Sequence, residues 1–243
     1  MYETSALGFE ILAESLVRTP IALGPSRFDW VISFNGTNPH IVEYLRNLAK
    51  LSSVPIRIVV QDAATCPLPL PQPLLGMWKT CPPRLNIDTH EIICDNDIVF
   101  VQQSNPIQEF IDGTRAMMAI DTVRFFGKLD HLHPSGEKWN SGLIGLPPGY
   151  DFGRELKRSW DSCGQPNHMG YGEEQSLITH VLKKQNPIIV GQDHVRELHP
   201  DTPHRFSDSD CAFHFVESNR KEHRRAREFL AWVGRNDPKI PML

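Results

Sequence analysis

The chain has few cysteines, and their spacing argues against two classes of protein. Five cysteines lie scattered over 243 residues, without the short paired spacing of a zinc site. Their odd number also does not fit the disulfide framework of a small secreted domain. We therefore expect neither cysteine-bound zinc nor disulfides, and a reducing, cytoplasmic location. The five are Cys66, Cys81, Cys94, Cys163 and Cys211.

Long apolar segments and a strong excess of one charge are also missing. No segment reaches the roughly 18 apolar residues that a membrane-spanning helix needs, and the N-terminal residues lack the pattern of a signal peptide. The formal net charge of -4 gives no reason to expect a nucleic-acid partner. A basic cluster at residues 220–225 is expected to form mostly a solvated helix face, with contact to an anionic ligand or a membrane surface as the alternative. Peripheral membrane contact therefore stays open.

The order of hydrophobic patterns predicts an α/β fold. Residues 29–35 read as a buried strand, 40–51 follow helical periodicity, and 54–62 read as a second apolar strand. Strand, helix, strand is the unit of a parallel sheet. We expect a single Rossmann-like domain over residues 1–243, its core at about 29–233, with a mostly parallel central sheet flanked by helices.

The carboxyl ends of the first two strands are the first place to look for a ligand site, because nucleotides bind there in such folds. Phe34, Asn35 and Asp62 stand at these ends, and we expect them to contact a base and a ribose. The alternative is a core aromatic beside ordinary strand-end polar residues. Further strands are expected at 89–94, 98–101, 116–121, 139–146, 187–190 and 210–215, and helices at 106–111, 151–163, 173–184 and 218–233.

Two carboxylates stand two positions apart at the end of an apolar strand. Asp95, Asn96 and Asp97 follow the apolar residues 92–94, and the apolar pattern resumes at Ile98. A strand that leaves a core into a turn can present such a pair to a divalent metal that carries a diphosphate. The alternative is an ordinary polar turn, whose carboxylates accept hydrogen bonds from nearby backbone amides.

Two later motifs carry groups suited to a sugar. Asn140 and Ser141 offer neutral hydrogen bonding for hydroxyls, although they also fit an ordinary turn. Glu173 and Glu174 begin a helix, where the helix dipole alone favours acidic residues. Functionally, Glu174 with Gln175 could hold a sugar, or a glutamate could act as a general base. Both interpretations stay open.

Histidines in two places are candidate metal ligands. His214 lies in the apolar run 211–216, where a core histidine bonded to backbone is the alternative to a ligand. One imidazole with two carboxylates is a donor set more natural to manganese than to calcium. His131 and His133 alternate as zinc ligands can, but nothing nearby completes a tetrahedral set, so we expect a loop near the acceptor.

In this order, the motifs resemble a GT-A glycosyltransferase domain, especially the retaining family that includes glycogenin and bacterial lipopolysaccharide galactosyltransferases. The resemblance covers residues 29 to about 230. Glu217 stands where the family usually has glycine and Arg220 where it has lysine, so diphosphate contact by this segment is less well supported than metal contact. A long acceptor-binding extension is also missing. The matching motifs are Asp95-Asn96-Asp97, Asn140-Ser141-Gly142-Leu143, Glu173-Glu174-Gln175, and His214-Phe215 with Asn219, Arg220 and Lys221.

The resemblance implies roles for individual residues. Manganese, or magnesium, is expected at Asp95, Asp97 and His214. Glu174, Gln175 and Asn140 are expected at the sugar as catalytic residues. Lys79 and Arg84, which precede the metal strand, would otherwise be a solvated pair. Contacts to the nucleotide are expected from Phe34, Asn35, Asp62, Lys79, Arg84, Asn96, Ser141, Arg220 and Lys221.

The predicted activity is metal-dependent transfer of a sugar from a nucleoside diphosphate sugar to a glycan, lipid or protein acceptor. A UDP-sugar is expected because the family commonly uses it. The alternatives are a non-catalytic nucleotide- or glycan-binding module of the same fold and a metal-dependent phosphoester hydrolase. The hydrolase is disfavoured because the sequence shows no second cluster of carboxylates and histidines at two-metal spacing. Stereochemical outcome and oligomeric state are left open.

Overall fold

The computed structural model of the protein describes most of the chain. Four predicted site residues, Asn35, Asp62, Arg220 and Lys221, fall outside the described ranges. Within those ranges, no helix is long and apolar enough to cross a membrane. The described residues are 6–34, 38–61, 66–68, 78–80, 84–164, 170–201, 203–207, 209–216 and 223–236.

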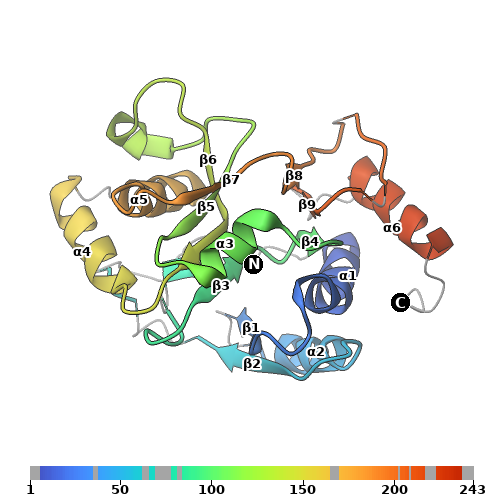
Figure 1. Cartoon of the computed structure of the whole chain (residues 1–243). Coiled ribbons are helices and arrows are strands. Elements are labelled where there is room, and N and C mark those ends of the chain that lie inside the picture. The colour runs from blue at the N-terminus through green and yellow to red at the C-terminus, as the bar shows by residue number, and fades with distance from the viewer. Residues whose placement is uncertain are drawn as a thin grey trace.

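Helices and strands are interspersed along the chain, and each element expected after residue 29 has a counterpart (Figure 1). The helices are α1 Ala6–Leu23, α2 Pro39–Ala49, α3 Asn105–Asp112, α4 Phe152–Ser162, α5 Tyr171–Lys183 and α6 Arg224–Asn236, with 3₁₀ turns η2 Trp78–Thr80 and η3 Gly127–Leu132. The strands are β1 Trp30–Phe34, β2 Ile56–Val60, β3 Glu91–Cys94, β4 Ile98–Phe100, β5 Met117–Ile120, β6 Trp139–Leu146, β7 Ile188–Val190, β8 Arg196–Glu197 and β9 Ala212–His214.

The start of α2 shows how local sequence defines an element. The Asn38 side chain accepts a hydrogen bond from the His40 backbone N–H at 2.9 Å, which caps the helix. Pro39 has no backbone N–H, and the first helical position tolerates this, because an N–H there would have no partner within the helix. Val42, Leu45 and Leu48 form the buried stripe of the helix. Their spacing of three residues gives the helix its apolar face.

The strands form three sheets, and the central one is of mixed direction, so the expectation of a mostly parallel central sheet is wrong. β1 pairs with β2 in parallel. The central sheet has the order β3-β6-β5-β7, in which β6 runs antiparallel to both neighbours and only β5–β7 is parallel. The third sheet, β4-β9-β8, is also mixed. A parallel pair of strands needs a long crossover connection, usually a helix. Only the short η3 turn lies between β5 and β6 in the described chain, so β6 returns antiparallel to β5 and lies between β5 and β3.

Helices cover both faces of the central sheet. On one face, Leu156 of α4 and Leu177 of α5 pack with Ile144 of β6. On the other face, Phe110 of α3 packs with Met117 of β5. All five side chains are fully buried, and burial of each stabilises the fold by roughly 1.5–3 kcal/mol. Figure 1 shows α4 and α5 to the left of this sheet and α1 and α6 to the right.

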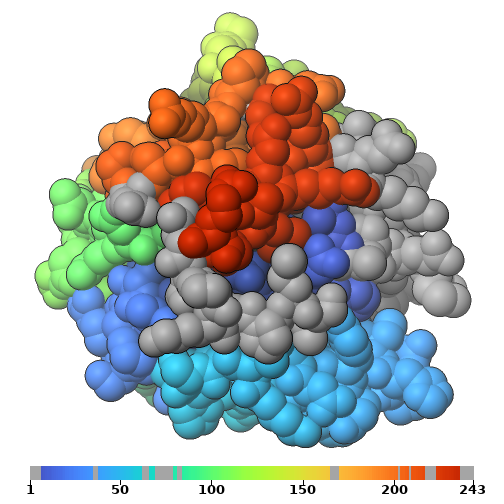
Figure 2. Space-filling view, turned by 90° about the vertical axis from the view of Figure 1, so that its right-hand side faces the viewer, coloured from blue at the N-terminus to red at the C-terminus, as the bar shows by residue number. Residues whose placement is uncertain are grey.

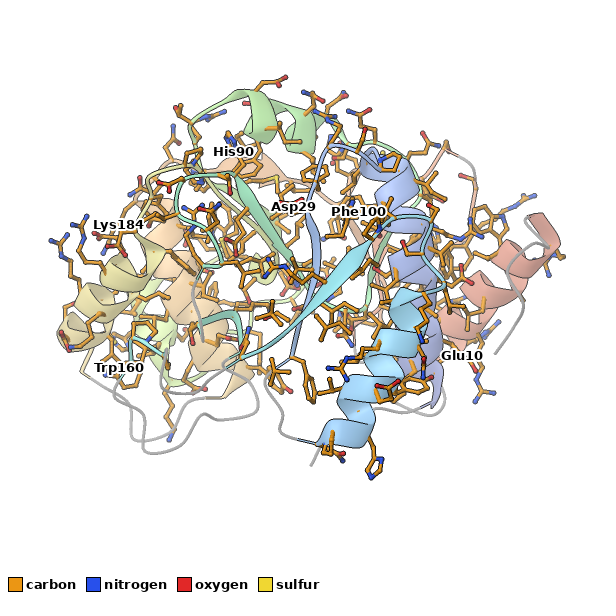
Figure 3. The ribbon with its side chains drawn as sticks, turned by 90° about the horizontal axis from the view of Figure 1, so that it is seen from below. Glu10, Asp29, His90, Phe100, Trp160 and Lys184 are labelled. Carbon is orange, nitrogen blue, oxygen red and sulfur yellow. The ribbon has the colours of Figure 1, made fainter. Side chains whose placement is uncertain are left out.

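The N-terminal helix α1 was not expected from the sequence, and it packs against β4. Its Ser15 hydroxyl donates to the Ile98 carbonyl at 2.7 Å, and its Thr19 hydroxyl accepts from the Phe100 N–H at 3.2 Å. Figure 3 shows Phe100 beside this helix. The other side of α1 meets α6, and the two lie together on the face seen in Figure 2. The strand that follows the Asp-Asn-Asp turn is therefore held by a helix on one side and by β9 on the other.

Candidate metal centre

Strand pairing fixes the turn that carries Asp95 and Asp97. The Asp95 backbone N–H donates to the Gly142 carbonyl of β6 at 2.7 Å. On the other side, the Phe215 N–H donates to the Asp97 carbonyl at 3.0 Å, next to the β4–β9 pair in which Ile98 lies opposite His214. Two different sheets thus pin the two ends of the turn. This pairing brings His214 to the turn across more than a hundred residues of sequence.

Asp95, Asp97 and His214 form a compact group of ligand atoms. One ligand atom from each lies within 4.8 Å of the others. The His214 Nε2 atom is 3.4 Å from Asp97 Oδ1 and 3.9 Å from Asp95 Oδ2. Although burial alone would lower the pKa of His214, the carboxylates of Asp97, Asp95 and Glu197 outweigh it and raise the pKa to about 9. The donor set of two carboxylates and one imidazole fits a divalent cation such as manganese.

Gly142 leaves the space beside these ligands open. A Cβ atom at this position would lie 2.8 Å from His214 Cε1 and 2.9 Å from Asp95 Oδ2. It would also lie 2.6 Å from Asn140 Oδ1. All three distances are too short for non-bonded contact, so only glycine fits without moving a ligand.

Lys79 supplies a buried positive charge at the same place. Its Nζ lies 2.8 Å from Asp95 Oδ1 and 3.4 Å from the Ser141 hydroxyl oxygen. Burial lowers the pKa of Lys79, but Asp95 and the other acidic groups nearby outweigh burial and raise it overall. Lys79 therefore stays charged and compensates part of the negative charge of the site.

Glu174 and its neighbours Glu173 and Gln175 have three different environments. Glu174 is 1% exposed, and burial raises its pKa to about 8 despite the opposing charge of Lys79. Glu173 caps α5, accepting hydrogen bonds from the backbone N–H groups of Gly170 and Lys128. Glu173 thus has the role expected of an acidic residue that only caps a helix. Glu174 instead lies near the charges of Lys79 and Asp95.

The Gln175 side chain links α5 to β6 and to the chain after β5. Its Oε1 accepts from the Ser141 N–H at 3.3 Å, and its Nε2 donates to the Phe125 carbonyl at 3.0 Å. The same nitrogen is 3.4 Å from Asp121 Oδ2. The amide plane of Gln175 is thereby fixed at the edge of the site.

A further acidic pair, Asp121 and Glu197, adjoins Asn140. The Asn140 Nδ2 donates to Glu197 Oε1 at 2.7 Å. Burial and the Glu197 carboxylate raise the pKa of Asp121 to about 7. Burial also works to raise the pKa of Glu197, but hydrogen bonds from Asp121 and Thr122 outweigh it and lower the pKa. One proton therefore stays on Asp121, and Glu197 carries the charge.

Asp121 and Glu197 were missed by sequence reasoning. Asp121 closes an expected strand, which is a signal that could have drawn attention to it. Glu197 lies in a polar stretch and in a strand of only two residues, and its burial comes from pairing with β9. The sequence holds no local signal for it.

Other predicted residues lie elsewhere or contact different groups. Phe34 packs in the apolar cluster of Leu45 and Leu48, as the core alternative expected. The Arg84 guanidinium donates to backbone carbonyls, including those of Pro147 at 2.7 Å and Tyr150 at 2.9 Å. Nucleotide contact by Phe34 and Arg84 stays a prediction, and we leave both out of the site. Asn96 is exposed at the tip of the metal turn.

The two loop histidines do not form a metal site with other described residues. The described part of the chain holds a single group with metal-site geometry, and it is the one at Asp95. His133 is buried, stacks on Phe126 and lies 2.8 Å from the Ser176 hydroxyl, so its role is in packing. His131 is exposed on η3.

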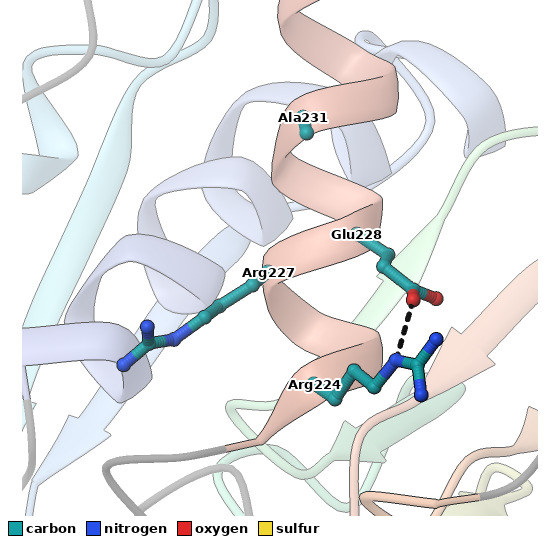
Figure 4. Close-up of a pocket in the computed structure, with 4 residues that line it drawn as sticks. All are labelled: Arg224, Arg227, Glu228 and Ala231. Carbon is teal, nitrogen blue, oxygen red and sulfur yellow. Dashed lines mark hydrogen bonds and ion pairs between the residues drawn. The ribbon is translucent and has the colours of Figure 1, made fainter.

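A shallow surface hollow lies on α6, away from these carboxylates. It is lined by Arg224, Arg227, Glu228 and Ala231, and Arg224 pairs with Glu228 within it (Figure 4). Of the described residues of the basic cluster, Arg224 is exposed, as expected for a solvated helix face, whereas His223 and Arg225 are buried. Among the described residues, the side chains that line this hollow are not part of a group of three or more that could hold a metal ion.

Comparison with solved structures finds glycosyltransferases of the same shape. The galactosyltransferase LgtC, solved in complex with donor and acceptor sugar analogs, matches over 93% of this chain and 92% of its own, with a TM-score of 0.56 and 12% identity. The fold of the protein is the GT-A fold of these glycosyltransferases. The glycosyltransferase GlyE of Streptococcus pneumoniae TIGR4 matches over 93% of this chain, with a TM-score of 0.55 and 9% identity, and this chain spans 58% of GlyE. No protein family and no curated protein sequence matches the chain.

Proposed function

We propose that the protein transfers a sugar from a nucleoside diphosphate sugar to an acceptor, assisted by a divalent metal at Asp95, Asp97 and His214. The observation that carries the proposal is the convergence of these three side chains within 4.8 Å, in a GT-A fold. The LgtC structure of the same fold holds donor and acceptor sugar analogs. Uridine is the proposed base, on the family resemblance alone.

Manganese or magnesium is the proposed ion. The space next to Gly142 and the two carboxylates suit a hard divalent cation, and His214 adds a nitrogen ligand. When bound, the ion supplies positive charge that stabilises the departing diphosphate.

The surrounding side chains are proposed to hold the donor. Lys79 adds a fixed charge for the diphosphate, 2.8 Å from Asp95. Asn140 and Gln175 have amides whose orientation is fixed by neighbouring groups, so they can hold sugar hydroxyls without reorganisation. Glu174 is mostly neutral below a pH of about 8 and can donate a hydrogen bond to the sugar.

Nucleotide contact by five further residues is proposed on the sequence resemblance. Asn96 is exposed at the metal turn and stays a candidate for the nucleotide. The other four, outside the described residues, stay proposals on the resemblance alone. They are Asn35, Asp62, Arg220 and Lys221.

An exposed apolar surface next to Gln175 is proposed to bind the acceptor. Val123, Phe125 and Tyr171 are 50%, 55% and 48% exposed. The Phe125 backbone carbonyl accepts from Gln175, and the Phe125 ring lies against Gly172, next to Tyr171. Aromatic faces of this kind can pack against the apolar face of a sugar ring. An acceptor that carries a glycan fits this surface.

Thermal unfolding with a panel of nucleoside diphosphates and nucleotide sugars tests the donor proposal. Each ligand is added with manganese and, separately, with a chelator. A ligand that binds only the folded protein stabilises it by roughly 2.7 kcal/mol at a hundredfold excess over its dissociation constant. We expect a manganese-dependent shift with one nucleotide class, which identifies the base. The absence of a shift with every nucleotide would contradict the donor site.

Product analysis then separates transfer from the alternatives. We expect release of nucleoside diphosphate that requires a glycan acceptor. Binding without release would identify a binding module, and cleavage of simple phosphoesters without a sugar would identify a hydrolase. Phe125→Ala should raise the acceptor KM and leave the donor KM unchanged.

A further inference from the structure

Glu197 of β8 lies behind the metal ligands and contacts two residues of the site. Its Oε1 atom accepts from Asn140 Nδ2 at 2.7 Å and lies at ion-pair distance, 3.9 Å, from His214 Nδ1. Its Oε2 atom accepts from the Thr122 backbone N–H at 2.8 Å and from the Thr122 hydroxyl. The side chain is 4% exposed. This buried carboxylate thus accepts hydrogen bonds from Asn140 and Thr122 and lies at ion-pair distance from His214.

Only an acceptor-only side chain satisfies these neighbours. The Asn140 Oδ1 atom accepts from the Gly142 N–H, so the Asn140 amide cannot turn round, and its NH₂ group must face Glu197. Thr122 presents an N–H on the other oxygen. A glutamine at position 197 would therefore place its NH₂ group against either the Asn140 NH₂ or the Thr122 N–H, and two donors would face each other. The charge of Glu197 is required by the hydrogen-bond pattern.

The backbone of Glu197 is also fixed. Its N–H donates to the Gln192 side-chain oxygen at 2.9 Å, and the Gln192 Nε2 atom donates to the Ile120 carbonyl of β5 at 2.9 Å. Pairing of β8 with β9 places Glu197 opposite His214. Both the backbone and the carboxylate of Glu197 are therefore held in position.

The two ring nitrogens of His214 face different partners. Nε2 faces Asp97 and Asp95, and Nδ1 faces Glu197. A metal-binding histidine commonly donates its second N–H to a carboxylate, which fixes the ring and its tautomer. We propose that Glu197 is a positioning residue that holds His214 with Nδ1 protonated and Nε2 directed at the metal, while it also holds the Asn140 amide. This inference rests on the proposed function.

Metal binding without turnover tests the role of Glu197. Metal-free wild-type and Glu197→Gln protein are titrated calorimetrically with Co²⁺ and with Mg²⁺. Co²⁺ binds imidazole well, whereas Mg²⁺ is held chiefly by carboxylates and water. We expect Glu197→Gln to weaken Co²⁺ binding by about 10- to 100-fold, as loss of such a carboxylate does in other sites. The loss for Mg²⁺ should be clearly smaller.

The contrast between the two metals separates positioning from general damage. Equal losses for Co²⁺ and Mg²⁺, or no loss, would overturn the inference. If the wild-type protein binds neither metal, the proposed function itself fails, which is a different outcome. Glu137→Gln is the matched control, because Glu137 pairs with Lys183 and has no contact to the site; its affinities should equal those of the wild type.

A second variant answers the same question if Glu197→Gln does not fold. Glu197→Asp keeps the charge but withdraws the carboxylate from His214 by one methylene. Circular dichroism establishes folding of each variant before titration. The same selective loss of Co²⁺ binding is expected for Glu197→Asp, and affinities for both metals equal to wild type would overturn the inference.

Discussion

The end of the central sheet and the β1–β2 region were both expected to bind the donor, but they are built differently. At the sheet end, charged groups lie in pairs: Lys79 is 2.8 Å from Asp95, and Glu197 is 3.9 Å from His214. At the end of β1, Phe34 packs among aliphatic side chains of α1 and α2. Buried charges cost stability unless they serve a ligand or pair well, whereas apolar packing stabilises directly. Among the described residues, the comparison teaches that paired charged groups gather at the end of the central sheet, whereas apolar packing gathers at the end of β1.

Removing one metal ligand should have the largest effect on activity. Asp97→Asn keeps the shape of the side chain but removes its charge, and we expect metal-dependent turnover to fall by roughly 10³-fold or more, about 4 kcal/mol. Steady-state kinetics with manganese measures the loss, and thermal unfolding should show an intact fold. Asp161→Asn is the control, because Asp161 lies at an exposed position of α4 and pairs with Lys157. Full activity of Asp97→Asn would remove the central premise of the proposed function.

Filling the space beside the ligands should have the next largest effect. Gly142→Ala introduces a Cβ 2.8 Å from His214 and 2.9 Å from Asp95, so one ligand must move. We expect manganese affinity, measured by electron paramagnetic resonance, to fall by roughly tenfold or more. Gly234→Ala is the control, because a Cβ there meets nothing within 4 Å. Unchanged manganese binding in Gly142→Ala would mean that the metal lies elsewhere.

Truncating Phe34 should have the opposite pattern. Phe34→Ala removes half-buried apolar packing, and we expect the free energy of unfolding to fall by about 2 kcal/mol with manganese affinity unchanged. Urea unfolding measures the first quantity and metal titration the second. Phe34→Leu, which keeps most of the volume, should lose less. A loss of nucleotide affinity in Phe34→Leu without a loss of stability would return this residue to the binding site.

Neutralising Glu174 should stabilise the protein at high pH. Its folded pKa, about 8, lies above the ordinary value of 4.5, so the folded state holds a proton that the unfolded state has lost. This contribution to stability is complete below pH 4.5 and is lost as the pH rises to 8. Glu174→Gln should therefore nearly match the wild type at pH 4.5 and exceed its free energy of unfolding by roughly 4 kcal/mol at pH 8. Parallel urea titrations at both pH values measure the difference, and equal stability at pH 8 would contradict the buried, uncharged state.

Much of the site could be predicted because its signals are local. The Asp95-Asn96-Asp97 turn lies between two apolar runs, and the helix that carries Glu174 begins with acids and continues with apolar residues. Such patterns depend on neighbours in sequence. Their order was sufficient to predict the GT-A fold, which the comparison with LgtC confirmed.

The parts that were wrong or missed depend on distant contacts. The mixed direction of the central sheet follows from β6 entering between β3 and β5, which no local pattern encodes. Glu197 becomes buried only when β8 pairs with β9. The helix α1 contains Pro20, a residue that counts against a helix interior, and packing against β4 offsets that cost.

The hydroxyls of Ser15 and Thr19 on α1 supply hydrogen-bond partners to one edge of β4, as a neighbouring strand would. They occupy the Ile98 carbonyl and the Phe100 N–H, the groups that β9 does not reach. A chain trimmed to begin at β1 would carry an open strand edge next to its metal turn, and open edges recruit other strands. The N-terminal helix therefore covers the edge of β4 that β9 leaves open, in addition to completing the core.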